Sequence, residues 1–478
     1  MNVKKAAIIN AGSKFFIIAV QLVITAILGR ILSPADYGVV AVIVVLVNFF
    51  TVISDVGFTS AVIQHKELTK EDFNQIFSVT VYLGFILGTV FIASSRILVI
   101  VYDSPVYKLM GLLLSVSVLF SSMNAVPEAV LMRDKKFLLA AFRNIGSCTI
   151  AGVIAIICAL NGFQYYALAI QMIAGPVLIF LFNALVSEVR FTPVPDLKPV
   201  RRLLQFSVFQ SLFDAVNFFS RNMDNLIAGK VFGKEKLGLY NKAYSLTLYP
   251  VNNLAGVISP VLHPILSDYQ TEPEKLYRKI MSVVRVMGVA GAFIAPFCFF
   301  EGKELILIVF GDKWKDSVDC FRFLSLSLFA QMMNQCISAS FQCLGKTKQM
   351  FINGLINTVI TVVAILIGIF SFGDIYGLAL CVAIAYIIRF FIAYFILLQF
   401  GFQKSFFSFL REIAPELIML IVLFAVAFWV HLSIDNVFYS FLVKGIIMGT
   451  LFGVLLLLTG DWKLIKDILL PSKQKNNA

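Results

Sequence analysis

Charge, tryptophan and histidine are scarce in this sequence of 478 residues. Asp, Glu, Lys and Arg together make up 14% of it, whereas soluble domains contain about 25%. There are three Trp, three His and seven Cys, an odd number with no Cys-x-x-Cys pair, so neither a disulfide framework nor a metal site is indicated. With 59% hydrophobic residues and a mean hydropathy of +0.90, the composition argues against a soluble enzyme and predicts a protein whose main solvent is lipid.

Motifs of catalysis and nucleotide binding are also missing. The segment Leu344-Gly345-Lys346-Thr347 resembles the end of a phosphate-binding loop, but Ser340 stands where the earlier glycine belongs. No nucleophile elbow or zinc-protease motif occurs, and Glu128 and Glu416 are isolated carboxyls near predicted helix ends. We therefore predict no enzyme activity and no cofactor.

Apolar runs long enough to cross a bilayer recur along the chain. A helix needs about 20 mostly apolar residues to span the hydrocarbon core. On that length we predict an all-α, polytopic integral membrane protein with about 14 transmembrane helices. Their approximate limits are 5–31, 38–61, 76–101, 106–127, 140–160, 164–187, 204–229, 238–263, 279–300, 320–343, 350–370, 375–398, 413–432 and 438–460.

The net charge of +12 is explained by basic loops rather than by nucleic acid. If the N-terminus is cytoplasmic, Lys and Arg concentrate in the cytoplasmic loops, as the positive-inside rule requires. Two such loops carry Arg133, Lys135, Lys136 and Arg143, and Arg190, Lys198, Arg201 and Arg202. Both termini are then cytoplasmic, and the basic tail lies against membrane lipids.

A short internal repeat divides the chain. Gly29-Arg30-Ile31-Leu32 precedes a turn that ends in Gly38, and Gly229-Lys230-Val231-Phe232 precedes a turn that ends in Gly238. Six predicted spans separate the two copies, an even number, so both halves enter the membrane in the same direction. In transporters built from repeats, the substrate site lies between the repeats near the middle of the membrane.

Polar side chains follow one face of the first span of each half. Lys14 and Gln21 lie on the first, at helical spacing, and a longer polar stripe lies on the seventh. A charge at the bilayer centre costs about 2.5–3.5 kcal/mol, so these side chains must face protein or water. We favour a water-filled cavity, although Asp214 pairing with Lys14 or Arg221 in a dry contact is an alternative. The candidate substrate-binding residues are Lys14, Gln21, Gln210, Asp214, Asn217, Arg221, Asp224 and Asn225.

Other polar residues inside predicted spans are less specific. Asn353, Asn357 and Thr361 form a line on the eleventh span, and Arg389 lies deep in the twelfth without an assigned role. Asp55 is either a polar helix end or part of an inner gate. Four basic residues near span ends are interpreted as interfacial anchors: Arg30, Arg96, Arg285 and Lys444.

Several ordered motifs resemble one transporter family. The first are Leu32-Ser33-Pro34-Ala35-Asp36-Tyr37-Gly38 and Ser54-Asp55-Val56-Gly57-Phe58. The others are Arg221 to Lys230, Leu237-Gly238-Leu239-Tyr240, Pro260 to Pro264 and Phe310-Gly311-Asp312-Lys313-Trp314. Together they are similar to the Wzx-type polysaccharide transporters of the multidrug/oligosaccharidyl-lipid/polysaccharide superfamily, most of all to the colanic-acid and teichuronic-acid exporters.

The resemblance implies an architecture like that of the MATE transporters. It predicts two six-helix lobes at 1–190 and 204–400, a cytoplasmic linker at 191–203, and two extra helices with a basic tail at 401–478. The Pro-rich linker fits a stiff connector.

The same resemblance implies a flippase in the bacterial inner membrane. It would move an undecaprenyl-pyrophosphate-linked glycan to the outer leaflet by alternating access, alongside a polysaccharide polymerase and glycosyltransferases. The coupling ion, Na⁺ or H⁺, is left open, with Asp214 as its candidate site. A cation-coupled multidrug exporter of the same superfamily and a membrane glycan polymerase or ligase are the alternatives.

Overall fold

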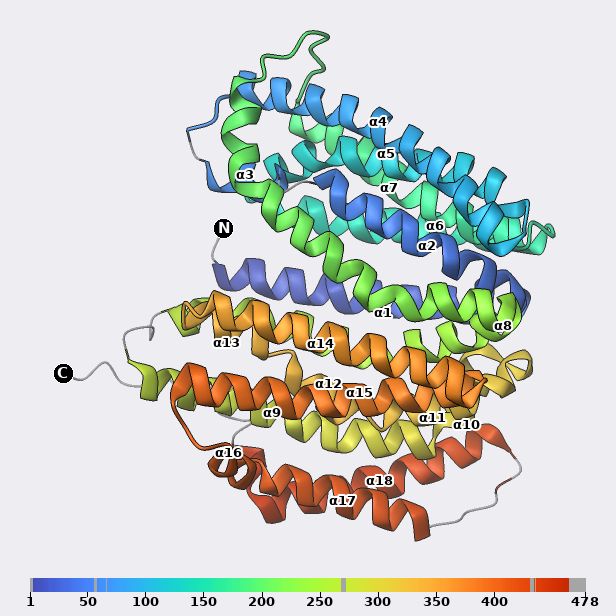
Figure 1. Ribbon diagram of the computed structural model, residues 1–478, viewed down its shortest axis with the longest axis vertical. Coiled ribbons are helices and arrows are strands. Elements are labelled where there is room, and N and C mark those ends of the chain that lie inside the picture. The colour runs from blue at the N-terminus through green and yellow to red at the C-terminus, as the bar shows by residue number, and fades with distance from the viewer. Residues whose placement is uncertain are drawn as a thin grey trace. The chain divides into compact units, whose positions relative to one another are not determined.

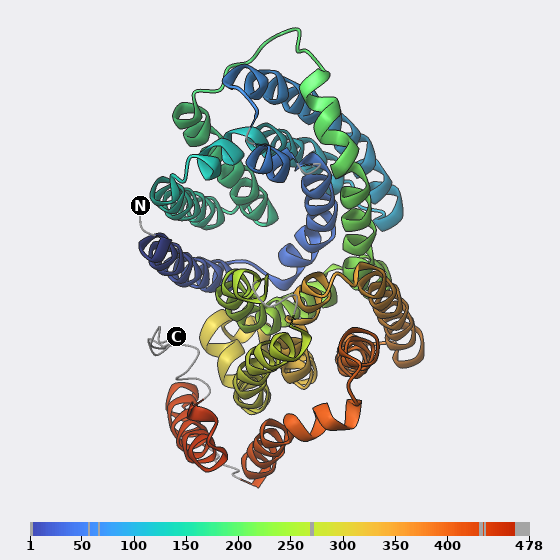
Figure 2. The same cartoon turned by 90° about the vertical axis from the view of Figure 1, so that its left-hand side faces the viewer.

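The computed structural model describes residues 3–55, 58–65, 67–267, 272–429, 434 and 436–463. Side chains are described for most of these, but not for 3–11, 55, 201–217, 219–221 or 255–267 among others. All regular elements in these ranges are helices, which confirms the predicted all-α class. The chain divides into two compact units, Met1–Gly238 and Leu239–Ala478, each a bundle of helices that run side by side (Figures 1 and 2).

The first unit contains the helices α1 to α7 and the first part of α8. Their bounds are α1 Val3–Ile31, α2 Pro34–Asp55, α3 Phe58–Gln64, α4 Lys70–Tyr102, α5 Val106–Arg133, α6 Phe137–Leu160 and α7 Tyr165–Ser187. Helices α4, α5 and α7 pack side by side, and α1 packs on α6. Phe58, Phe77 and Phe180 belong to a buried apolar cluster that joins α3, α4 and α7.

Helix α8, Lys198–Ser267, continues from the first unit into the second. It is two helices joined at Gly233, where φ is +82° and ψ is 171°. That conformation is accessible to glycine and to almost no other residue, so Gly233 fixes the place of the break.

The second unit contains the rest of α8 and the remaining helices. They are α9 Pro273–Phe300, α10 Gly302–Phe310, η1 Asp312–Ser317, α11 Val318–Ser325, α12 Leu328–Asn334, α13 Ile337–Cys343, α14 Thr347–Ile367, η2 Gly368–Phe372, α15 Ile375–Ile396, η3 Leu397–Phe402, α16 Phe406–Glu412, α17 Ala414–Trp429 and α18 Val437–Thr459. The core includes Trp314, Phe321 and Tyr394, all buried. The Tyr394 hydroxyl donates to the Met333 carbonyl at 2.8 Å.

Helix starts follow local sequence signals. Ser33 and Asp36 form reciprocal hydrogen bonds ahead of α2, whose first residue is Pro34, and Thr69 and Asp72 form the same capping box on α4. The Asp374 carboxylate accepts from the Gly377 amide at 2.6 Å to cap α15.

Ten helices in the described ranges are long and apolar enough to cross a membrane, or eleven if the bent pair α16 and α17 is one span. Many large apolar side chains on them are exposed, as on a lipid-facing surface. The chain is therefore a multi-pass membrane protein. The predicted count of 14 is not confirmed.

One predicted span is divided into short helices, and another begins at a bend. The segment predicted as 320–343 forms α11, α12 and α13, which are separated by turns at 326–327 and 335–336. Beside the first turn, the buried Ser325 and Ser327 hydroxyls bond to the Phe321 and Leu324 carbonyls at 2.6 and 2.7 Å. Such irregular backbone is tolerated at membrane depth where protein covers it. The segment predicted as 413–432 corresponds to α17 within the described residues, and the 57° bend lies at its start, between α16 and α17, just before Pro415, which has no amide hydrogen.

Candidate functional site

Two of the predicted substrate-binding residues lie on α1. Lys14 and Gln21 are both exposed within the first unit. Helix α1 packs closely on α6, where a Cβ on Gly152 would lie 2.0 Å from Cδ1 of Ile24, yet only 17% of its span is buried. These two positions are accessible in their own unit, and their binding role remains a prediction.

The other predicted residues lie on α8 and α2. Gln210, Asp214, Asn217 and Arg221 belong to α8, and Asp55 ends α2, but these five side chains are outside the described residues.

Asp224 and Asn225, also on α8, are buried, with 2% and 5% of their surface exposed. The Asp224 carboxylate accepts from the Asn225 backbone amide at 2.8 Å. No structural observation assigns a substrate to either residue, so their proposed role in binding also stays a prediction.

The two repeated turns approach each other through glycine. A Cβ on Gly38 would lie 1.6 Å from the Lys234 carbonyl oxygen, and a Cβ on Gly238 would lie 1.8 Å from the Pro34 carbonyl oxygen. Positions 34 and 234, and 38 and 238, share the offset of the sequence repeat, so the contact is reciprocal, as in a two-fold interface. Glycine is needed at both places because any side chain would meet backbone.

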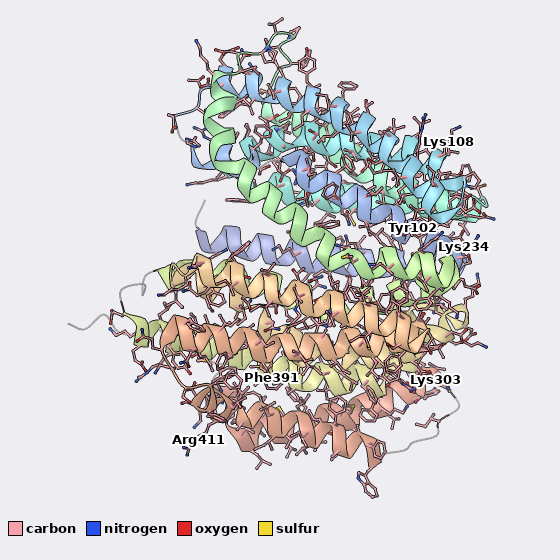
Figure 3. The ribbon with its side chains drawn as sticks, viewed as in Figure 1. Tyr102, Lys108, Lys234, Lys303, Phe391 and Arg411 are labelled. Carbon is pink, nitrogen blue, oxygen red and sulfur yellow. The ribbon has the colours of Figure 1, made fainter. Side chains whose placement is uncertain are left out.

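The same end of the first unit is fixed by Tyr102 at the end of α4. Its hydroxyl donates to the Leu226 carbonyl at 2.7 Å, and Figure 3 shows Tyr102, Lys108 and Lys234 at this end. A Cβ on Gly229 would lie 3.2 Å from the Tyr102 ring. The motif glycines therefore allow α8 to pack closely on its neighbours.

A buried polar cluster joins α5, α6 and α7, and sequence analysis missed it. Arg143 of α6, with 4% of its side chain exposed, forms an ion pair with Glu128 of α5. It also donates to the side-chain oxygens of Asn183 at 2.6 Å and Asn144 at 2.7 Å. The Asn183 amide donates to Asn124 at 2.7 Å and to Glu128 at 2.8 Å.

This cluster corrects two expectations. Glu128 is not isolated, and Arg143 is not a loop residue but part of a helix that packs on α7. Asn124 and Glu128 are four residues apart on α5 and so share a face, which is the sequence signal that could have indicated the cluster. Because its donors and acceptors satisfy one another, the cluster stabilises the packing of three helices.

A second polar cluster lies at the middle of two spans in the second unit. Arg389 is 14 residues from the start and 13 from the end of the span Ile375–Phe402. Its guanidinium donates to the Thr361 hydroxyl of α14 at 3.2 Å and lies 4.9 Å from the centre of the Tyr386 ring. The Tyr386 and Tyr244 hydroxyls share a hydrogen bond of 2.6 Å.

The α14 face beside Arg389 is the polar line predicted from sequence. The side-chain oxygens of Asn353 and Asn357 are buried and have no hydrogen-bond partner among the described residues. A guanidinium binds phosphate oxygens in a planar fork, while amides and hydroxyls bond to sugars, and tyrosine faces stack on them. We define Asn357, Thr361, Tyr386 and Arg389 as the mid-span cluster, and Asn353 lies one turn nearer the start of α14. The cluster is a candidate site for an anionic, hydroxyl-rich ligand.

Two predicted interfacial anchors are ion-pair partners instead. Arg285 of α9 lies 2.7 Å from the Glu416 carboxylate of α17 and 2.6 Å from Asp461, which follows α18, and both acids are buried. Lys444 of α18 lies 2.6 Å from Glu304 of α10. Glu416 is therefore not isolated, and these pairs join the last two long helices to the rest of their unit.

A family model described as polysaccharide biosynthesis protein matches residues 27–319, more than half of the chain. The chain belongs to this family. The lipopolysaccharide biosynthesis protein WzxC of Escherichia coli K12 is 22% identical over 370 residues, which are 75% of this chain and 73% of WzxC. These matches confirm the family that the ordered motifs predicted.

Solved structures show the fold. The lipid II flippase MurJ, in an inward closed conformation, matches with a TM-score of 0.74 at 17% identity, over 97% of this chain and 99% of MurJ. An inward-facing multidrug resistance MATE transporter of the MOP superfamily matches with a TM-score of 0.65 at 14% identity, over 81% and 96%. The chain therefore shares the fold of these MurJ and MATE structures, as predicted.

Proposed function

We propose that this protein is a flippase that moves a polyprenyl-pyrophosphate-linked oligosaccharide from the cytoplasmic to the outer leaflet for surface polysaccharide synthesis. The family description and the relationship to WzxC support the polysaccharide part. The MurJ fold supports a transporter of lipid-linked glycans, because MurJ is named for flipping lipid II.

The observation that carries the proposal is the mid-span cluster. A cation at mid-membrane costs about 2.5–3.5 kcal/mol, so an Arg at this depth marks a substrate pathway or a partner. The Arg389 guanidinium donates to Thr361, and the planar fork of a guanidinium matches the geometry of phosphate oxygens. Pyrophosphate oxygens would accept from this fork, and the asparagine side chains one and two turns from Thr361 on α14 would bond to the first sugars.

Lys14 complements this role from its own unit. Its ammonium is an exposed point charge on α1, suited to attract phosphate without fixing its orientation. We keep it as a substrate ligand, together with Gln21 and, on α8, Arg221. The membrane potential, interior negative, favours outward movement of the anionic head group by about 2.3 kcal/mol per charge and 100 mV.

The setting follows from the same proposal. The protein would lie in the bacterial inner membrane with both termini in the cytoplasm, as the basic loops predict. Its partners would be the glycosyltransferases that assemble the lipid-linked glycan and the polymerase that consumes it. Alternating access would involve separation of the glycine turns that meet at Gly38 and Gly238.

The test is flipping in proteoliposomes that contain a fluorescent polyprenyl-pyrophosphate glycan, read with an impermeant quencher. Arg389→Ala removes the fork and should weaken binding about tenfold to a hundredfold, since hydrogen bonds to charged groups contribute about 1.5–3 kcal/mol. Arg389→Lys keeps the charge but not the fork and should lose less. The matched control is Arg96→Ala, an exposed basic residue near the end of α4.

Wild-type flipping with unchanged rates in Arg389→Ala would overturn the binding role of the cluster. Absence of glycan flipping by the wild type, combined with export of cationic dyes, would overturn the proposed function in favour of a multidrug exporter.

A further inference from the structure

Two carboxylates lie together where α9 ends and α10 begins. Glu301 connects the two helices and is 0% exposed, and Glu304, in the first turn of α10, is 5% exposed. Figure 3 labels Lys303, between them in sequence, at the end of the second unit opposite Arg411. Both acids follow the span that ends at Phe300, so they lie at the boundary of the apolar region.

The two acids have different partners. One carboxylate oxygen of Glu304 accepts from the Lys444 ammonium at 2.6 Å and from the Ser440 hydroxyl at 2.8 Å, both on α18. Neither carboxylate oxygen of Glu301 has a hydrogen-bond partner among the described residues, and both are buried. Glu301 also makes no side-chain cap on α10, although the helix N-terminus beside it favours an anion.

The other charged groups near Glu301 do not neutralise it. The helices packed against α10 are α9, α11, α18 and η1. Arg322 of α11 lies against Gly302 but pairs with Asp319 at 3.4 Å, and Cys298 is the titratable residue of α9 nearest to Glu301 in sequence. The other charged residues of α10 and η1 are exposed: Lys303, Asp312, Lys313, Lys315 and Asp316.

Of these two buried carboxylates, the Lys444 ammonium bonds to Glu304 and not to Glu301. A buried, ionised carboxylate without a partner is unfavourable by several kcal/mol and instead takes up a proton. Burial, then the charge of Glu304, raise the pKa of Glu301 to about 8, against the opposing effect of Lys444. For Glu304, burial acts in the same upward direction, but the hydrogen bonds from Lys444 and Ser440 outweigh it and lower its pKa. Such divergence within a pair separates a proton carrier from a fixed charge.

We propose that Glu301 is a proton-binding site of this protein, with the ion pair of Glu304 and Lys444 as its fixed neighbour. The proton is the ligand, and the carboxylate of Glu301 is its base. Lys444 keeps Glu304 ionised, and the negative charge of Glu304 retains the proton on Glu301.

A consequence for transport rests on the proposed function. In the orientation that the basic loops predict, α9 runs outward and Glu301 lies at its outer end. Protons from outside would then load Glu301, and the pH of the outer compartment would control the flipping rate. Proton binding is measured without transport, so failure of the proton-binding proposal can be distinguished from failure of the proposed flippase function.

The test is infrared difference spectroscopy of the purified full-length protein in lipid nanodiscs, between about pH 6.5 and about pH 9.5. A protonated carboxyl has a carbonyl stretching band that a carboxylate lacks. We expect one such band in the wild type, lost with an apparent pKa near 8, and we expect Glu301→Gln to lack it. The control Glu235→Gln removes an exposed carboxyl and should keep the band.

Glu304→Gln provides the second variant. It removes the repulsion and releases Lys444, so the band of Glu301 should be lost at clearly lower pH. A wild type without a titrating carboxyl band would overturn the proposal whether or not any variant folds. A band that persists in Glu301→Gln would overturn it too, and a titration that does not shift in Glu304→Gln would refute the role of the neighbouring pair.

Discussion

The buried cluster of the first unit offers a quantitative test of how its helices are held together. Arg143 has 4% of its side chain exposed and pairs with Glu128, whose side chain is 23% exposed. Glu128→Gln keeps the shape of the acid but leaves the guanidinium as a buried cation without its counter-charge. Arg143→Met removes the cation and leaves Glu128 with the Asn183 amide at 2.8 Å.

The expected magnitude follows from burial. Removing one partner of a buried ion pair costs about 3–5 kcal/mol, mainly because the other charge stays buried. Glu128→Gln should therefore destabilise by about 3 kcal/mol, at the lower end because the acid is partly exposed. Arg143→Met should cost somewhat less, since the remaining acid reaches solvent and keeps an amide donor.

The assay is equilibrium unfolding in mixed micelles, applied to both single variants and to the double variant. Removing both charges leaves no buried ion. The double variant should therefore lose about 2 kcal/mol less unfolding free energy than the two single variants lose together. Lys136→Met is the control, because its pair with Asp134 is 3.2 Å long but solvent-exposed and should contribute less than about 1 kcal/mol. Strict additivity of the two buried substitutions would refute the pairing on which this reasoning rests.

Three further outcomes are expected from the remaining contacts. Gly38→Ala should destabilise by about 1–3 kcal/mol, because its Cβ would meet a backbone oxygen at 1.6 Å, while Gly146→Ala, with no atom within 4 Å, should not; thermal unfolding of both proteins checks this. Arg285→Gln should cost about 3–5 kcal/mol in the same micelle assay, since Glu416 and a second buried acid lose their cation, and a loss below about 1 kcal/mol would contradict the ion triad. The free energy of unfolding should fall as pH rises from about 4.5 to about 8, because the folded protein keeps a proton on Glu301 that the unfolded chain has released. Thermal unfolding measured at several pH values checks this, and Glu301→Gln should show a weaker pH dependence.

Sequence predicted most of the spans because apolar length is a local property. The run predicted as 375–398 lies within the span Ile375–Phe402, and the run predicted as 76–101 lies within Lys70–Tyr102. Apolar length cannot show a break, however. The segment 320–343 has enough apolar residues for a span, but turns at 326–327 and 335–336 divide it into α11, α12 and α13.

The polar clusters were predicted unevenly for a related reason. The line of Asn353, Asn357 and Thr361 follows helical spacing on one element, so periodicity found it. Its cation, Arg389, comes from the next helix, and only the packing of α14 on α15 brings the two together. The sequence showed a polar face and a deep arginine separately, and neither alone indicated a site.

The same limit explains why charges near span ends were assigned to the lipid interface. Arg285 and Lys444 have the position of snorkelling residues, but their partners Glu416 and Glu304 are more than a hundred residues away in sequence. A long cationic side chain can extend to the lipid interface or pair with a buried acid. Burying an ionised carboxylate without a counter-charge is unfavourable, so a cation that can reach such an acid pairs with it. In this chain, buried acids near span ends therefore indicate that Arg285 and Lys444 form ion pairs and are not lipid anchors. The same rule applies to Glu301. This buried acid has no basic side chain within hydrogen-bond distance among the described residues. Binding a proton is the remaining way to neutralise its charge.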